Sequence, residues 1–302
     1  MTLVIAHNNS VNNFDAARLR PVFLLLLDGW GVAPSSEANA IRSAKIPVWL
    51  NLIKEYPVGI LNPGQETLNA RYLTLGTGQA LNDENQETEL TLTKIISAAG
   101  KKQIKITETE RLAALTHFFN GHNETKAAGE DWLIVSSEAG DHSLKPALAL
   151  KRITREVLKT IEQEKYDFGV VVVPTVDLVA ASGDLKAVKK AVEAVDQSLK
   201  KIKEAVLNKR GILIVSSAQG NAERIKNLAT EFPDKEMTSN PVPLVIVGEE
   251  YKGKTIGLTD PVNNDLSLLQ PIGDLADLAP TILEILDLKP GESMTGKSLI
   301  DK

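Results

Sequence analysis

The sequence predicts an α/β fold in which a doubly wound, mostly parallel β-sheet carries helices on both faces. Short runs rich in Val, Ile and Leu alternate along the chain with longer segments of helical periodicity. The apolar runs lie at residues 22–27, 133–135, 170–173, 212–215 and 244–247, and the helical segments at 150–164, 185–207 and 275–286. Because the runs are continuously apolar and show no strict alternation with polar residues, each is expected to be a buried parallel strand covered on both faces.

The helix expected at 185–207 has the clearest pattern of the three. Its apolar residues recur at alternating steps of three and four, as on one face of an α-helix: Leu185, Val188, Val192, Val195, Leu199, Ile202 and Val206. Lysines and a few acids occupy the other faces, which is typical of a solvated helix surface. The same spacing fits a heptad, but three repeats without strong Leu or Ile seams favour a helix that docks on a sheet.

The first twenty residues are interpreted as an N-terminal extension, and residues 21–302 as a single domain. Residues 1–20 are rich in Asn and lack the basic start, apolar centre and small-residue cleavage site of a secretory signal. A cytoplasmic protein is therefore expected. Within the domain, the polar segment 82–89 is expected to be a surface loop leading into a helix that ends at Gly100.

Composition excludes several classes of function. Hydrophobic residues make up 43% of the 302 residues and charged residues 24%, close to the averages of soluble globular proteins. The chain has no cysteine, which removes disulfides, thiolate metal sites and cysteine nucleophiles. Its net charge of -5 argues against nucleic-acid binding, because neutralising phosphates requires a basic face. The apolar run at 23–27 is far shorter than the ~20 residues of a membrane-spanning helix, so no membrane association is expected.

Polar residues follow three of the predicted strands. Asp28 comes directly after the first strand, Asp177 shortly after the strand at 170–173, and a polar turn at 216–221 follows the strand at 212–215. In doubly wound sheets, ligands bind beyond the carboxyl ends of the strands. These positions are therefore the candidate functional site.

Asp28-Gly29-Trp30-Gly31 opens a series of motifs that occur in the same order in one enzyme family. The later motifs include Asn39-Ala40-Ile41, Gln103-Ile104-Lys105-Ile106, Phe118-Phe119-Asn120-Gly121, Gly220-Asn221-Ala222-Glu223, Asn240-Pro241-Val242-Pro243 and Met294-Thr295-Gly296-Lys297. From about Pro21 to its end, the chain resembles the cofactor-independent phosphoglycerate mutases of the alkaline phosphatase superfamily. The resemblance implies an alkaline phosphatase-like core.

The resemblance also implies a reaction mechanism, and the residues of this chain can be compared with those that the mechanism requires. The family uses two manganese ions and a serine that carries the phosphoryl group between positions on glycerate, and two metals clamp the attacking and leaving oxygens. Two of the metal-binding aspartates are retained, as Asp28 and Asp177. The remaining metal-ligand positions fall on residues that are not family ligands, namely Ala181, Ala218, Gln219 and Met237.

Further parts of the family's apparatus are altered. The nucleophilic serine matches Leu68 or Asn69, and a shifted alignment would place Thr67 there instead. The family also inserts a whole domain whose arginines hold the substrate, and here a short segment near 80–102 takes its place. Arg111 stands where the family has a lysine, so this position still carries a positive charge. Arg111 is therefore a candidate substrate-binding residue.

Two hypotheses follow for function. The first is a catalytically inactive mutase-like protein that needs no cofactor and has a binding, structural or regulatory role with a protein or small-molecule partner that the sequence does not identify. Its two acids would then be inherited positions, accommodated by solvent or backbone donors. The alternative is a metal-dependent phosphoesterase or phosphotransferase in which Asp28 and Asp177 hold manganese or magnesium, since two carboxylates plus waters suit magnesium.

Overall fold

The structure is a computed structural model that describes residues 21–64, 66–81, 83–86, 88–137, 148–227, 230, 232–257 and 259–300. The segment interpreted as an N-terminal extension lies outside these ranges. Within them, no helix combines the length and the apolar character needed to cross a membrane.

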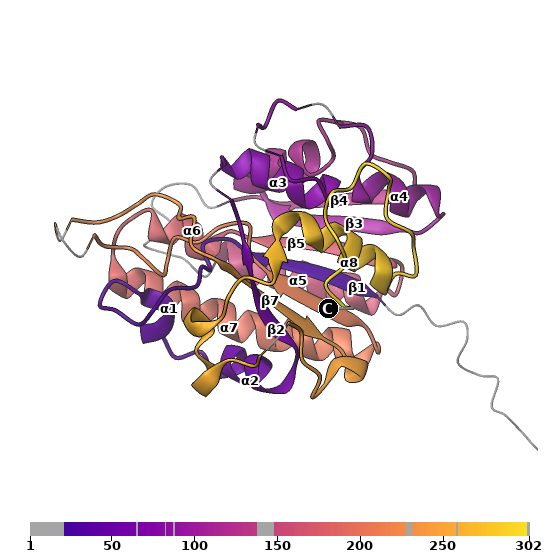
Figure 1. The fold of residues 1–302 in the computed structure, drawn as a ribbon. Helices are drawn as coiled ribbons and strands as arrows, with labels where there is room; N and C mark the ends of the chain where they lie inside the picture. The colour runs from indigo at the N-terminus through magenta and orange to yellow at the C-terminus, as the bar shows by residue number, and fades with distance from the viewer. Residues whose placement is uncertain are drawn as a thin grey trace, which may run out of the picture.

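A single mixed sheet forms the centre of the described residues (Figure 1). Its strands are β1 (Val22–Leu27), β2 (Val58–Asn62), β3 (Gln103–Glu108), β4 (Glu130–Val135), β5 (Phe168–Val173), β6 (Ile212–Ser216), β7 (Val242–Val247) and β8 (Gly273–Asp274). Their order is β4-β3-β5-β1-β6-β7-β2-β8. The fully buried β1 pairs in parallel with β5 on one side and β6 on the other. The predicted mostly parallel sheet is confirmed, and each predicted apolar run lies within a strand.

The prediction that residues 244–247 form a parallel strand is wrong, because β7 runs antiparallel to both β6 and β2. The described residues between β6 and β7 contain no helix that could cross the sheet. The chain leaves β6 at the carboxyl edge, folds into a loop there, and re-enters the sheet from the same edge. A strand that begins at the edge where its neighbour ends must run in the opposite direction, whereas a parallel return needs a crossover.

Helices cover both faces of the sheet. They are α1 (Ala40–Ser43), α2 (Pro47–Glu55), α3 (Leu68–Thr77), α4 (Leu92–Ala98), α5 (Leu148–Glu162), α6 (Thr175–Ala180), α7 (Leu185–Asn208) and α8 (Leu278–Ile285). Short 3-10 or π turns lie at η1 (Thr109–Arg111), η2 (Ala114–Phe118), η3 (Glu249–Tyr251), η4 (Val262–Asn264), η5 (Leu266–Leu268) and η6 (Leu275–Asp277). The helix predicted at 275–286 therefore begins as η6 and continues as α8.

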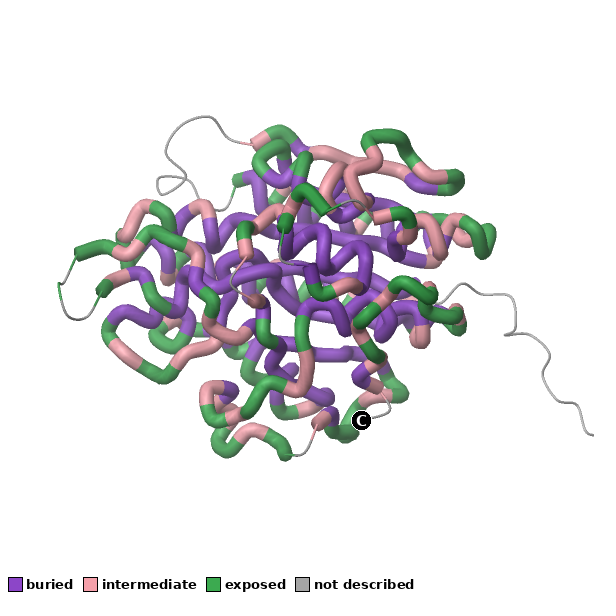
Figure 2. The backbone as a smooth tube through the Cα atoms, turned by 45° about the horizontal axis from the view of Figure 1, so that its top comes forward, coloured by how far each residue is buried: buried purple, intermediate pink, exposed green. Residues whose placement is uncertain are grey.

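Two apolar cores lie on the two sides of the sheet. Alternate residues of β1 belong to different cores: Phe23, Leu25 and Leu27 pack with α2, α5, α6 and α7, whereas Val22, Leu24 and Leu26 pack with α3, α4 and α8. Figure 2 shows the buried residues concentrated in the interior of the described fold, with exposed residues on its outside. The continuous apolarity of β1 follows from this double burial.

The start of α2 is fixed by a carboxylate from a distant part of the chain. Ile46 makes no side-chain cap at this helix end. The buried Asp196 of α7 instead accepts hydrogen bonds from the backbone N–H of Val48 and of Trp49, at 3.2 and 2.8 Å. A carboxylate at a helix N-terminus satisfies otherwise unpaired donors and complements the helix dipole. The pairing locks α2 onto α7.

A buried charge pair joins the segment around α4 to the edge of the sheet. Lys105 of β3 lies 2.5 Å from a Glu130 oxygen of β4, and its ammonium also donates to Thr93 Oγ1 at 2.9 Å and to Asn120 Oδ1. Trp132 Nε1 donates to the same Glu130 oxygen at 2.6 Å. Burial lowers the pKa of Lys105 to about 8, although Glu130 opposes the shift. These hydrogen bonds hold α4 and the turn after η2 against β3 and β4.

We predict that Lys105→Met lowers the free energy of unfolding by about 3–5 kcal/mol, because Glu130 is left buried without its cation. The double variant Lys105→Met/Glu130→Gln should recover most of this loss, since it carries no buried charge. Urea denaturation of the wild type, the two single variants and the double variant gives the coupling energy. Additive losses would contradict the prediction.

Candidate functional site

Asp28 lies at the carboxyl end of β1 and is completely buried. Its Oδ2 atom accepts a hydrogen bond from the Tyr72 hydroxyl at 2.8 Å and from Arg111 Nε at 2.9 Å. The expectation that solvent or backbone donors accommodate this carboxylate is therefore wrong. Side chains from α3 and η1 accommodate it instead.

Asp177 lies in the first turn of α6, directly beyond β5. Its backbone N–H donates to the carbonyl oxygen of Asp28 at 3.1 Å, so the two acids are adjacent. Its Oδ1 atom accepts a hydrogen bond from Asn221 Nδ2 at 2.9 Å. Gly29 permits this approach, because a Cβ atom there would lie 2.7 Å from the Asp177 nitrogen, and its φ of +86° favours glycine.

Arg111 joins the two acids. Its Nη2 donates to Asp177 Oδ2 while its Nε donates to Asp28 Oδ2, so one guanidinium bridges both carboxylates. Only 7% of Arg111 is exposed. A planar guanidinium offers several donors in a fixed fork, which suits it to two carboxylates at once. The bridge places a permanent positive charge between the two retained acids.

The three charged groups alter one another's proton affinity. Burial raises the pKa of the Asp28 carboxyl; Arg111 opposes this shift, and the negative charge of Asp177 adds to it. Although burial alone would lower it, Asp28 and Asp177 raise the pKa of Arg111. Burial and the neighbouring Asp28 raise the pKa of Tyr72 well above its usual value. Tyr72 therefore acts as a hydrogen-bond donor to Asp28.

The other positions matched to family ligands lie around the same edge of the sheet. Ala218 and Gln219 are buried in the loop after β6, and the Gln219 carbonyl accepts a hydrogen bond from the Gly29 N–H at 3.1 Å. Met237 is half-buried and immediately precedes Thr238, which pairs with Gly220 of that loop. Ala181 caps the end of α6, four residues after Asp177, and is exposed.

The positions matched to the family nucleophile begin α3. Leu68 is half-buried and packs against the core on the α3 and α8 side, and Asn69 is also half-buried. Thr67 is the N-cap residue of this helix, and its hydroxyl accepts a hydrogen bond from the Ala70 N–H at 3.3 Å. The residue of α3 that reaches the acids is Tyr72, one turn beyond Leu68.

Sequence reasoning assigned no role to Tyr72, Asn221 or Arg71. The buried Arg71 donates to the carbonyl oxygens of Thr238 and Gly64, at 3.1 and 3.0 Å, and so ties α3 to the loop that precedes β7. Asn221 lies within a recognised motif, and this membership was the one available signal. Tyr72 had no signal of its own, because its importance comes only from its distance to Asp28.

The residues present do not fit the two-manganese centre that the family resemblance implies. Within the described ranges, no three His, Cys, Asp or Glu side chains form a group that could hold a metal ion. Asp28 and Asp177 supply two carboxylates without an imidazole, and each already gives an oxygen to Arg111. Manganese sites of this kind need a larger shell of oxygen and nitrogen ligands.

Several buried oxygens at this edge of the sheet lack hydrogen-bond donors in the described part of the chain: Asp28 Oδ1, Ser216 Oγ, Gln219 Oε1 and Asn221 Oδ1. Buried polar atoms are nearly always paired in folded proteins, so a concentration of unpaired ones needs an explanation. Here they occur where the family would place its metal shell.

Sequence comparison identifies related proteins. The profile of the Metalloenzyme superfamily matches residues 20–290. A 2,3-bisphosphoglycerate-independent phosphoglycerate mutase of Chloroflexus aurantiacus is 39% identical over 210 residues, which are 69% of this chain and 37% of the relative. The 2,3-bisphosphoglycerate-independent phosphoglycerate mutase 1 of Methanosarcina barkeri is 38% identical over 219 residues, 72% of this chain and 39% of the relative. The chain thus spans well under half the length of these relatives.

Structural comparison agrees with the predicted core. A phosphoglycerate mutase of Leishmania mexicana, solved at low cobalt concentration, aligns with a TM-score of 0.60 and 25% identity over 69% of this chain and 39% of its own. The TAB5 alkaline phosphatase aligns with a TM-score of 0.60 over 90% of this chain and 99% of its own, at 9% identity. The second likeness concerns the fold alone, and the predicted alkaline phosphatase-like core is confirmed.

We predict that the free energy of unfolding of Asp28→Asn increases relative to that of the wild type as the pH rises above about 4. Because the pKa of Asp28 is raised on folding, the native protein holds an extra proton above the unfolded value of 3.8. Wild-type stability therefore falls with rising pH until the native group has ionised, and the variant lacks this loss. Urea denaturation at several pH values from about 3.5 to about 7 measures the difference.

The surface variant Asp260→Asn controls for the loss of one negative charge, since Asp260 is exposed. A free energy of unfolding of Asp28→Asn that stays constant or falls relative to the wild type as the pH rises would contradict the predicted shift.

Proposed function

Because the chain belongs to the Metalloenzyme superfamily, we propose that it is a phosphoglycerate mutase-like protein that does not transfer phosphate and acts through binding, structure or regulation. The observation that carries the proposal is the Arg111 guanidinium, which bridges Asp28 and Asp177. Here a side chain supplies the positive charge that a metal ion would otherwise supply between these two acids.

Electrostatics favours the guanidinium over a metal ion at this position. A divalent cation between Asp28 and Asp177 would compete for the same carboxylate oxygens and would stand next to a buried positive charge. Like charges in a poorly solvated site repel strongly. A metal ion could enter only if Arg111 moved away, and its buried guanidinium would then lose both partners.

The nucleophile and the substrate contacts give independent support. Neither Leu68 nor Asn69 carries a hydroxyl that a metal could activate, and Leu68 packs into the core. The Thr67 hydroxyl caps α3 and donates to Glu84 at 2.5 Å. Arg111, the candidate substrate-binding residue, already uses two of its nitrogens on the acids. The short segment near 80–102 leaves no room for the inserted domain that holds substrate in the family.

The first prediction of this proposal concerns turnover. Purified protein with millimolar manganese should convert neither 3-phosphoglycerate nor a simple phosphate monoester above the rate of a matched blank. A metal-activated nucleophile and a metal clamp on the phosphate are both required for such transfer. Manganese-dependent turnover that disappears in Asp28→Asn would overturn the proposal and favour the phosphoesterase alternative.

The second prediction concerns the role of Arg111 as the counter-ion. The wild-type melting temperature should not respond to chelator or to millimolar manganese. Arg111→Met should melt lower, because two adjacent buried acids then repel each other, and manganese should raise its melting temperature by a few degrees. In Arg111→Met/Asp28→Asn this response should vanish. Differential scanning calorimetry with and without manganese measures all three proteins.

Arg111→Lys is the matched control for charge. It keeps a cation near the acids but cannot bridge them as a planar fork, so it should melt lower than the wild type and remain insensitive to manganese. A manganese response in the wild type itself would show that a metal site coexists with Arg111, and the counter-ion role would then be rejected.

A further inference from the structure

The helices α5 and α7 form a basic surface on an acidic protein. They pack against each other on one side of the sheet and contain ten Lys and Arg residues but only five Asp and Glu. The whole chain contains 34 Lys and Arg residues and 39 Asp and Glu. Positive charge is therefore enriched on this layer, and the potential of such a surface steers negatively charged partners towards it.

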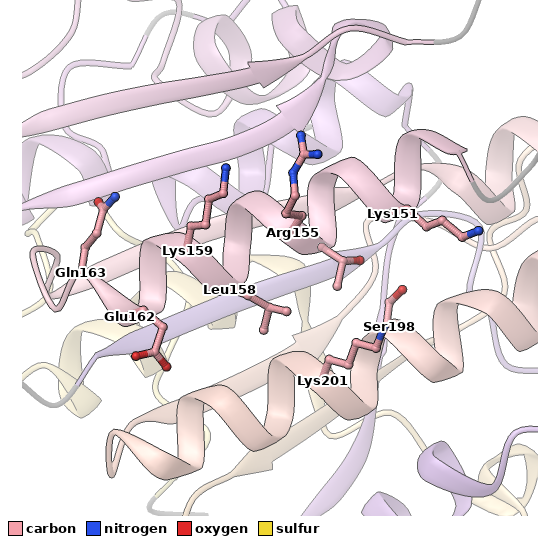
Figure 3. A pocket seen from close by; sticks show the side chains of 9 residues that line it. Lys151, Arg155, Leu158, Lys159, Glu162, Gln163, Ser198 and Lys201 are labelled. Atoms are coloured by element: carbon pink, nitrogen blue, oxygen red, sulfur yellow. The ribbon is translucent and has the colours of Figure 1, made fainter.

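A groove of about 650 Å³ runs between the two helices. Its lining includes Thr154 and Leu158 from α5 and Ser198 from α7, with Lys151 and Lys201 contributed by opposite sides. Figure 3 shows Leu158 and Ser198 directed into the space between the helices, while Arg155 and Lys159 extend from α5 away from α7. The acid Glu162 also lines the groove, and Lys209 pairs with it at 3.1 Å. The groove thus combines small groups and the apolar side chain of Leu158 with lysines from both helices.

Two of the groove lysines have no neutralising neighbour in the part of the chain that the structure describes. Among the described residues, neither Lys151 nor Lys201 forms an ion pair or a side-chain hydrogen bond. By contrast, Arg155 and Lys159 share the carboxylate of Glu156, at 2.9 and 3.2 Å. The positive charge available to a partner is therefore concentrated on Lys151 and Lys201.

We propose that this groove binds an amphipathic helix with acidic flanks, presented by a partner protein. The inference deepens the binding role proposed above and rests on it. The 15 residues of α5 extend for roughly 22 Å, which accommodates about four turns of a docked helix. An apolar stripe on that helix would contact Leu158 and the aliphatic stems of the lysines, and its acids would pair with Lys151 and Lys201.

The chemistry of the groove favours such a helix over a nucleic acid. Phosphate contacts require cations but gain nothing from a small or apolar floor, whereas a helix packs its own side chains into one. Leu158 and Ser198 are half-buried. The base of the groove can therefore pack against side chains of a bound helix, in addition to the charge contacts made by the lysines.

The experiment uses a fluorescein-labelled synthetic peptide of about 18 residues, with Leu at helical spacing and Glu on the flanking positions. Fluorescence anisotropy measures its binding to the full chain at low and physiological salt. Lys151→Glu/Lys201→Glu should weaken binding about tenfold or more, because two attractive pairs become repulsive. Ser198→Trp should weaken it similarly without changing charge, because the indole fills the groove.

Lys186→Glu/Lys190→Glu is the matched control, since it makes the same charge change on exposed lysines of α7 that do not line the groove. It should alter the affinity less than about twofold, as expected of distant exposed charges. Circular dichroism and melting curves establish that each variant is folded.

Three results would overturn the inference: no binding to the wild type, equal weakening in the control variant, or equal affinity for a scrambled peptide or a single-stranded oligonucleotide. The last would identify a non-specific polyanion surface. None of these results alters the proposal of inactivity, which is decided by turnover. Conversely, manganese-dependent turnover would refute inactivity while leaving the peptide measurements valid.

Discussion

The carboxyl edge of the sheet depends on how the chain neutralises two adjacent buried carboxylates. Asp28 follows β1, Asp177 follows β5, and Arg111 follows β3, and these three strands are neighbours in the sheet. One guanidinium therefore ties together the ends of three consecutive strands. Tyr72 and Asn221 add a donor each from outside this group, so α3 and the loop after β6 are oriented by the same two acids.

The bridge formed by Arg111 gives a structural reason for the retention of Asp28 and Asp177 in this chain. A carboxylate left alone in the interior would be costly, and so would an unpaired arginine. Changing any one member of the Asp28, Arg111 and Asp177 group thus penalises the other two. Residues at matched ligand positions outside the group, such as Ala218 and Met237, carry no charge and are free of this constraint.

Much of the fold could be predicted from the sequence, because a strand buried on both faces needs an unbroken apolar run such as 22–27. Three strands escaped this signal. β3 alternates apolar residues with Gln103, Lys105 and Thr107, so it has no continuous apolar run. β2 contains Gly59 and is only five residues long, and β8 has two residues. The direction of β7 was also inaccessible, since it depends on where the preceding loop lies and not on the composition of the strand.

Part of the candidate site could also be predicted from the sequence, because it follows from the predicted order of strands and loops. Asp28 and Asp177 were found because ligands gather where parallel strands end, which is a property of topology. The position of Arg111 between them was not found, because it lies 83 and 66 residues away from the two acids along the chain. Convergence over such separations is set by tertiary packing, and no local pattern in a single sequence records it.

The central place of β1 has a consequence for synthesis of the chain. β1 is made before the other strands that the structure describes, yet its neighbours β5 and β6 begin at Phe168 and Ile212. At translation rates of roughly 5–20 residues per second, the apolar segment Val22–Leu27 waits several seconds or longer for its first partner. Exposed apolar strands of this kind associate readily with other chains. The apolar segment of β1 therefore stays open to association with other chains until the sequence of β5 has been made.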